Sequence, residues 1–438
     1  MQFIQQILFV ILTGTALFLF WKKISEIRRN ILLGKEIELE HNPKARMRNL
    51  MLNALGQRKM FTNPLVAVLH RCVYVGCIII NIEIVEIILD GITGKHRLFL
   101  PFLGSGYTVL IGCFEVLAAL VLIACVVFLF RRNVVKIKRF NQGELSGGWP
   151  RSDANLILGF EIVLMSLFLL MNAADLNLQA LGSSHYHATG SFWISSFVSP
   201  MLQGLSEGNL IAIERICWWA HIAGIFVFMN YLPYSKHLHV ILAFPNAWYA
   251  SLDEKGKLSN MKEIQNEVLY MMQPELAPAQ TEGASIPKFG AKDVHDLHWK
   301  NLMDAYSCTE CGRCTAACPA NQTGKKLSPR KIMMDTRDRL EEVGRQIKPN
   351  QAWQEDGKTL LHDYISVEEL RACTTCNACV QECPVSISPL DIIMQLRRNL
   401  VMEESNAPQE WNQMFGNIEN NMAPWKFSPD DRDAWMTN

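Results

Sequence analysis

The balance of apolar and polar residues changes sharply near residue 245. Before this point, five long apolar runs lie near 4–21, 64–90, 105–130, 154–174 and 209–233. About 20 helical residues cross a hydrocarbon core of ~30 Å, so each run is long enough to span a bilayer. Thr62 and Asn63 before Pro64 form a good helix start for the second run. The pattern predicts a membrane part with five transmembrane helices.

The loops between these runs differ in positive charge. Residues 22–63 hold ten Lys and Arg and residues 131–153 hold six, whereas 91–104 holds two and 175–208 holds none. Because basic loops stay on the cytoplasmic side, we expect a multi-pass protein of the plasma (inner) membrane with its N-terminus outside and everything after the fifth helix inside. The first run lacks a preceding positive region and a cleavage site, so we interpret it as an uncleaved anchor.

Two cysteine groups stand in the polar part, as "CTECGRCTAACPA" and "CTTCNACVQECPV". Both follow C-x2-C-x2-C-x3-C-P, which is the run of bacterial two-cluster ferredoxins. In that arrangement the first three cysteines hold one [4Fe-4S] cube and the fourth ligates the other cube. The prediction for the first cluster is Cys308, Cys311, Cys314 and Cys383. The prediction for the second cluster is Cys373, Cys376, Cys379 and Cys318. Zinc is the main alternative, although its sites usually pair two short knuckles.

The segments around the cysteines predict helices. "SPRKIMMDTRDRLEEVGRQI" has a Ser cap, Pro at the first position and apolar spacing of helical type, and "SVEELRAC" and "SPLDIIMQLRRNLVMEE" are similar. The Pro-, Ala- and Gly-rich stretch 273–290 is typical of a linker. We therefore expect a mainly α protein, with a five-helix transmembrane bundle followed by an alpha-helical ferredoxin domain. The expected divisions are 1–245, a linker over 246–294, the cluster domain over 295–400 and a tail over 401–438.

Histidines in the apolar part are candidate haem ligands. An intramembrane imidazole is costly without a partner, and two neutral imidazoles can bind the axial positions of a haem iron. The candidates are His70, His221, His237 and His239, with Arg71 and Lys236 as candidate partners of the propionates. We favour His70 with His239, and a second haem would use His221 with an unidentified partner. Histidines hydrogen-bonded inside the bundle are the alternative.

Charged residues in the same part are candidates for quinone-linked proton exchange. They are Glu83, Glu86, Glu115 and Arg215. Glu83 and Glu86 share a helix face because they are three residues apart. Ion pairs and polar packing within the bundle are the alternative.

Charge and motif content exclude several functions. The chain has 42 basic and 42 acidic residues, so no nucleic-acid partner is expected. A Gly-rich flavin or nucleotide motif is absent from the sequence, and we assign no catalytic residue. The apolar runs lack the paired, Gly/Pro-broken segments of secondary transporters. A redox sensor without net electron flow stays open as an alternative to an electron carrier.

The motifs resemble known families. Residues 1–245 resemble the five-helix haem b subunits typified by the respiratory nitrate reductase gamma subunit, and residues 295–400 resemble the iron–sulfur subunit of heterodisulfide reductases. The combination, with "LPYSKHLH" followed by "FPN", is similar to membrane-bound heterodisulfide-reductase-like (Fe-S)-binding proteins. The resemblance implies haem b between helices two and five, and menaquinone or another quinone as substrate.

This resemblance also implies a partner. His70 matches the helix-two position, and His221 and His239 match helix five, but helix two carries one histidine where the two-haem members carry two. Many relatives continue into cysteine-rich catalytic domains, and this sequence has no cysteine after Cys383. We therefore expect an electron-transfer subunit that connects a quinone, haem b and two clusters with a separate cytoplasmic catalytic subunit, either a cysteine-rich-domain protein or a flavoprotein.

Overall fold

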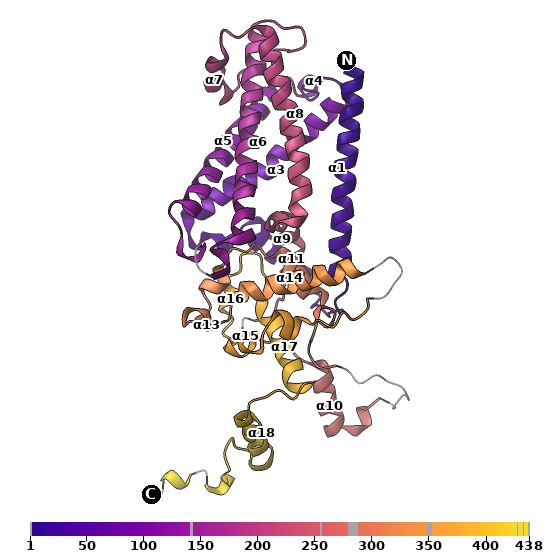
Figure 1. Cartoon of the computed structure of the whole chain (residues 1–438), viewed down its shortest axis with the longest axis vertical. Coiled ribbons are helices and arrows are strands. Elements are labelled where there is room, and N and C mark those ends of the chain that lie inside the picture. The colour runs from indigo at the N-terminus through magenta and orange to yellow at the C-terminus, as the bar shows by residue number, and fades with distance from the viewer. Residues whose placement is uncertain are drawn as a thin grey trace.

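Five long helices form the upper part of the molecule (Figure 1). The computed structural model describes residues 2–140, 143–254, 256–278, 288–347, 353–426, 428–431 and 433–436. The long helices are α1 (Gln2–Ile31), α3 (Pro64–Thr93), α5 (Ser105–Asn133), α6 (Gly148–Ala180) and α8 (Glu207–Tyr231). Each is long and apolar enough to cross a membrane. The predicted five-helix bundle is confirmed, and the described ranges contain no β-strand.

Shorter helices complete the membrane part and build the part beneath it. The shorter helices of the membrane part are α2 (Pro43–Asn49), α4 (Leu100–Leu103), α7 (Ser195–Val198) and α9 (His239–Trp248). Helix α10 (Lys262–Met272) follows them in the chain and lies beyond the membrane part. The helices of the part beneath it are α11 (Trp299–Ser307), α12 (Arg313–Ala316), α13 (Pro319–Gln322), α14 (Pro329–Gln346), α15 (Val367–Ala372), α16 (Ala378–Glu382), α17 (Pro389–Met402) and α18 (Gln409–Asn421). The fold class is mainly α, as predicted.

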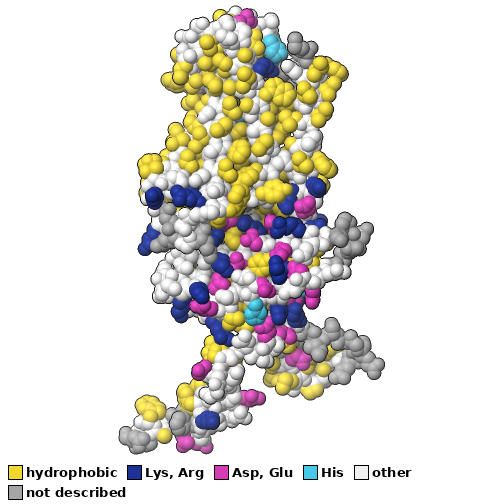
Figure 2. Space-filling model, viewed as in Figure 1, with side chains coloured by type: hydrophobic (Ala, Val, Ile, Leu, Met, Phe, Trp, Pro, Cys, Tyr) yellow, Lys and Arg dark blue, Asp and Glu magenta, His cyan; other side chains and the backbone are white. Residues whose placement is uncertain are grey.

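The surface divides as the sequence does. In Figure 2, apolar side chains cover the upper part, and Lys and Arg side chains gather below it. Outward-facing residues such as Phe18, Val85 and Ile123 are about half exposed or more, which in water would be an unfavourable surface. A lipid environment removes this cost for the upper part, so the surface agrees with a membrane protein.

Helix starts follow the capping signals of the sequence. The Asn63 side chain accepts from the backbone N–H of Val66, and Pro64 opens α3. Ser328 caps α14 in the same way, with Pro329 at the first position. Each cap satisfies a backbone donor that the helix itself leaves unpaired, which is why the predicted starts are confirmed.

The fifth membrane helix ends earlier than the apolar run. α8 stops at Tyr231, and two 3-10 helices, η6 (Leu232–Tyr234) and η7 (Lys236–Leu238), precede α9. Pro233 lacks a backbone donor and its ring clashes with a preceding turn, so it fits at the start of a new helix and not inside a long one. His239 therefore opens α9 and does not extend helix five.

The membrane part and the part beneath it share one hydrophobic core. Ile27 and Ile31 of α1 and Leu238 of η7 are buried together with apolar residues of α11, α14 and α17. The Lys35 N–H donates to the Leu297 carbonyl at 2.8 Å, which fixes the end of α1 on this domain. Residue 245 therefore marks a change from an apolar to a polar sequence, while the two parts on either side of it are packed together. Residues 279–287 of the predicted linker lie outside the described residues.

Candidate metal centres

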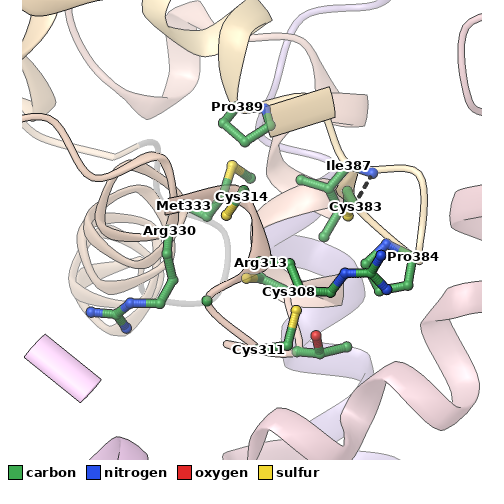
Figure 3. A pocket seen from close by; sticks show the side chains of 12 residues that line it. Cys308, Cys311, Arg313, Cys314, Arg330, Met333, Cys383, Pro384, Ile387 and Pro389 are labelled. Carbon is green, nitrogen blue, oxygen red and sulfur yellow. Dashed lines mark hydrogen bonds between the residues drawn. The ribbon is translucent and has the colours of Figure 1, made fainter. Parts of the chain in front are cut away.

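Four cysteines surround a first cavity, which Figure 3 shows from close by. They are Cys308, Cys311, Cys314 and Cys383. Cys308 follows the end of α11, Cys314 lies in α12, and Cys383 comes from the second motif after α16. Met333 and Ile387 contribute apolar walls. Three thiols of the first motif thus meet one thiol of the second.

The remaining four cysteines of the motifs surround a second cavity. They are Cys318, Cys373, Cys376 and Cys379. Leu390 and Ile393 of α17 form part of its wall. Cys376 is exposed, whereas Cys379 is 8% exposed. The structure brings the eight cysteines together in the crossed sets that the spacing predicts, and their role as ligands stays a prediction.

The backbone repeats between the two loops. Glu310 and Gly312 have positive φ of 49° and 70° in the first motif, and Thr375 and Asn377 have 56° and 60° in the second. Gly312 and Asn377 also stand at equivalent positions, just before α12 and α16. The left-handed residues turn the chain so that successive cysteines face one cavity.

Both cavities fit an iron–sulfur cube. Each cavity is lined by four thiols, which is the donor set that a [4Fe-4S] cluster uses. The N–H of Ile387 donates to Cys383 Sγ and that of Thr375 to Cys373 Sγ, both at 3.4 Å. Such bonds stabilise negative charge on cluster sulfur atoms.

Burial keeps three of these thiols neutral in the protein alone. It raises the pKa of Cys308 and Cys379 to about 12 and that of Cys383 to about 11. A bound metal deprotonates a coordinating thiol outright, so the cost of a buried thiolate is met by the positive charge of the iron. The burial that disfavours free thiolates therefore suits a tightly held cluster.

Three histidines of the membrane part have one ring nitrogen engaged. Nδ1 of His221 lies 3.0 Å from the Leu164 carbonyl, and Nδ1 of His239 lies 2.9 Å from the Lys236 carbonyl. Nδ1 of His70 lies 3.2 Å from Gln57 Oε1. A hydrogen bond of this kind fixes Nδ1 as the donor and leaves Nε2 as a lone-pair donor, as in most metal-ligating histidines. All three side chains fit a haem ligand.

The histidines lie at two levels. His70 lies close enough to His237 and His239 for their charges to interact, and the rings of His237 and His239 are 5.4 Å apart. Burial lowers the pKa of His237 to about 3 and also lowers that of His239, so both are neutral and able to ligate a metal. His221 lies farther up α8, with its ring 6.0 Å from that of Phe168.

The two candidate propionate partners contact protein groups. Arg71 donates to the Gly56 carbonyl at 2.5 Å and lies over the Phe61 ring. Lys236 donates to the Pro150 carbonyl at 2.6 Å, and its ammonium lies 3.7 Å from Asp153 and 3.9 Å from Glu310. Lys236 therefore connects the bundle with the first cysteine loop, and its role at a propionate stays a prediction.

The candidate carboxylates lie in a buried polar network. Glu86 accepts from the Tyr107 hydroxyl and Glu115 from the Ile194 N–H, both at 2.8 Å. Glu214 and Arg215 form an adjacent ion pair. Glu83 is 3% exposed, and its Oε2 has no hydrogen-bond partner among the described residues. Most of these groups are explained by polar packing, and Glu83 is the exception.

Arg97 is the central cation of this network, and sequence reasoning missed it. In the sequence it counts only as a loop charge, yet it is 7% exposed and donates to Asp175 at 2.7 Å and to Asn172 at 2.9 Å. The signal that could have found it is the pair of polar residues Asn172 and Asp175 inside the apolar helix four. Nothing in the sequence indicates that the loop folds back to meet them.

Comparisons with known proteins decide the class of the lower part. Residues 307–387 match the 4Fe-4S dicluster domain family. This part of the chain is therefore similar to domains that hold two [4Fe-4S] clusters. The chain is 28% identical to the "Probable iron-sulfur-binding oxidoreductase FadF" of Bacillus subtilis, an alignment that covers 98% of this chain and 60% of the relative. No solved structure matches the chain.

Two further relatives confirm the resemblance to heterodisulfide-reductase-like iron–sulfur proteins. The "EtfAB:quinone oxidoreductase" of Syntrophomonas wolfei is 26% identical, over 98% of this chain and 59% of its own length. One component of the ferredoxin/F(420)H(2)-dependent CoB-CoM heterodisulfide reductase of Methanosarcina acetivorans is 35% identical, over 24% of this chain and 53% of its own length. The chain spans about 60% of the first two relatives, which are longer proteins.

Proposed function

We propose that this chain carries electrons between a quinone in the membrane and a cytoplasmic redox subunit, by way of haem b and two [4Fe-4S] clusters. The observation that carries the proposal is the sorting of eight cysteines into two crossed cavities directly beneath a membrane bundle that holds histidines at the junction.

The first cluster uses the four thiols of the first cavity and the second cluster those of the second. The chain's own contribution is to shape both cavities, exclude water with apolar walls and donate N–H groups to sulfur. Each cube supplies a one-electron centre when bound. Because each motif lends its fourth cysteine to the other cavity, each site needs both motifs in the folded domain.

Haem b is held near the cytoplasmic end by His70 and His239, with His237 as the alternative to His239. The bonds from Nδ1 to Gln57 and to the Lys236 carbonyl support this assignment, because they orient the rings and leave Nε2 available. A second haem at His221 needs a ligand from another helix, and α3 offers no second histidine. One haem is therefore the better-supported number.

Quinone chemistry belongs to the opposite half of the bundle. A quinone exchanges two protons with every two electrons, so its site needs groups that carry protons. Glu83, Glu86, Glu115 and Arg215 are the candidates, and Glu83 is the strongest because its buried carboxyl oxygen lacks a partner among the described residues. The name of the Syntrophomonas relative supports a quinone as the membrane substrate.

The partner is a cytoplasmic catalytic subunit, either a cysteine-rich-domain protein or a flavoprotein. The Methanosarcina relative is named as one subunit of a heterodisulfide reductase, which supports a chain that acts together with other subunits. The positive charge of the loops supports a membrane orientation with the N-terminus outside and the clusters inside.

Optical and EPR spectra of the purified full chain test the proposal. We expect haem b absorption bands, two interacting [4Fe-4S] signals on reduction and about eight non-haem iron atoms per chain. Oxidation of a quinol by the chain with an artificial acceptor separates an electron carrier from a sensor. Absence of haem bands would contradict the proposed electron transfer through haem b in the membrane part. Stoichiometric zinc without iron would contradict the proposed [4Fe-4S] clusters.

A further inference from the structure

One short segment contacts both the histidine site and the first cysteine cavity. We name it the strap, residues 56–62, which comprises Gly56, Gln57 and the 3-10 helix η2 (Arg58–Thr62) immediately before α3. It lies at the junction between the bundle and the cluster domain. Its contacts on both sides are made by named side chains, so its role can be argued atom by atom.

On the cluster side, the strap is held by both cysteine motifs. The Lys59 ammonium donates to the Cys383 carbonyl at 3.0 Å and to the Val380 carbonyl at 3.3 Å. In return, Arg313 of the first motif donates to the Lys59 carbonyl at 3.0 Å and to the Thr62 hydroxyl at 3.0 Å. Arg313 also pairs with Glu382, the residue before Cys383. The strap therefore closes the two motifs around the first cavity.

On the histidine side, the strap fixes the start of α3. Gln57 is 7% exposed and has a left-handed backbone with φ of 50°, and its Oε1 lies 3.2 Å from His70 Nδ1. The guanidinium of Arg71 donates to the Gly56 carbonyl. Gln57 contacts His70, and Lys59 contacts the Cys383 carbonyl. Because one residue separates Gln57 from Lys59, a single turn of backbone joins the two contacts.

The other side of the histidine site reaches the same cavity. Lys236, which precedes His237 and bonds His239 through its carbonyl, has its ammonium 3.9 Å from Glu310. Glu310 stands between Cys308 and Cys311. Two independent connections from the histidines therefore end at the first cavity. In the second cavity, Cys376 is exposed, and the lining residues include neither the strap nor Glu310.

We propose that the strap is the electron link between the haem at His70 and the first cluster, and that Lys59 is a positioning residue that sets the potential of that cluster. The inference rests on the proposed function. With both groups bound, one electron would pass between the haem held by His70 and the cube held by the first cavity, so that one centre would be oxidised as the other is reduced. No bond breaks and no proton moves. The second cluster then exchanges electrons with the partner.

The charge of Lys59 gives the expected sign. Reduction adds one negative charge to a cube, and a cation next to a ligand backbone stabilises the reduced form. Lys59 contacts the carbonyl of Cys383, a ligand of the first cluster and not of the second. Removing this charge should therefore make the first cluster harder to reduce and leave the second unchanged.

EPR-monitored redox titration of the full chain tests this with Lys59→Gln, Lys59→Arg and the control Arg58→Gln. Arg58 is an exposed cation on the same strap. We expect Lys59→Gln to lower the equilibrium constant for reduction of the first cluster about tenfold, which is about 59 mV for one electron. We expect Lys59→Arg and Arg58→Gln to stay near the wild type, and rapid mixing to show slower electron transfer from the reduced haem to the first cluster in Lys59→Gln.

Equal shifts of both clusters, or none in Lys59→Gln, would overturn the proposal. If Lys59→Gln loses its first cluster on purification, Gln57→Leu provides the second test. We expect this variant to change the haem EPR signal while both clusters keep their potentials, and an unchanged haem signal would count against the strap. A wild-type protein without haem would contradict the proposed function, yet the effect of Lys59 on the first cluster would still be measurable.

Discussion

The two cysteine cavities share a motif and differ in what surrounds them. Both are lined by three cysteines of one motif and one of the other, and both have two left-handed residues at equivalent positions. The first cavity lies against the membrane part and is held by Lys59 and Arg313. The second opens toward solvent at Cys376. The motif therefore determines how the four cysteines are arranged, whereas the neighbours determine whether a cavity faces the membrane part or solvent.

Gly312 and Asn377 make this difference concrete. Both occupy the left-handed position before the short helix. A Cβ added at Gly312 would lie 2.6 Å from the Leu145 side chain, which belongs to the loop between α5 and α6. Asn377 carries a full side chain at the equivalent place. A side chain at position 312 would therefore require Leu145 to move, whereas the second motif accommodates Asn377.

Removing the crossed cysteines should have the largest effect. In Cys383→Ser we expect loss of the first cluster and retention of the second, and in Cys318→Ser the reverse, because each thiol crosses to the other cavity. Iron should fall from about eight to about four atoms per chain in each variant. EPR and iron analysis measure this. If Cys383→Ser instead lost the second cluster and kept the first, the crossed arrangement would be wrong.

His70→Ala should remove a haem and leave both clusters. His70 would be an axial ligand, and its loss leaves the iron without one of its two imidazoles. Haem content and the reduced-minus-oxidised spectrum measure the effect. His41→Ala is the matched control, because His41 is exposed outside the membrane spans. Full haem retention in His70→Ala would refute the assignment.

Arg339→Met should weaken both cavities equally. The Arg339 side chain is 0% exposed and pairs with Asp293 at 2.6 Å and Asp356 at 2.7 Å. Removing one partner of a buried pair costs about 3–5 kcal/mol of unfolding free energy. Helix α14, which carries Arg339, also supplies Met333 to the first cavity and Pro329 to the second.

Chemical unfolding of the Arg339→Met variant measures this cost, with the exposed Arg345→Met as control. Both EPR signals should be lost over the same range of denaturant, since α14 is common to the two sites. Selective loss of one cluster would contradict a shared scaffold.

The exchange of residues at the two left-handed positions should have the smallest effect and the sharpest asymmetry. Gly312→Asn keeps a backbone that Asn tolerates but forces Leu145 to move, a cost of about 1–3 kcal/mol. Asn377→Gly only adds backbone freedom, at about 1 kcal/mol or less. We expect a changed EPR line shape of the first cluster in the first variant and a wild-type spectrum in the second. Equal effects would mean that the two cavities have equivalent surroundings.

The helices and the cysteine sets could be predicted because their signals are local. Five apolar runs, the caps at Asn63 and Ser328, and the spacing within each motif act over a few residues. The crossing of Cys318 and Cys383 followed from the motif because two copies exist. The positions of the histidines were less predictable, since Pro233 starts a new helix and moves His239 onto α9.

The sequence by itself determined the polarity of the two parts, the helical class and the two sets of thiols, because hydrophobic burial and close ligand spacing are encoded within single segments. Only the tertiary structure decided that Arg97 turns inward to Asp175, that the end of α1 packs into the cluster domain, and that Lys59 lies on the Cys383 carbonyl. These contacts join residues far apart in the chain, and their partners are selected by the packing of whole helices, which no local pattern contains.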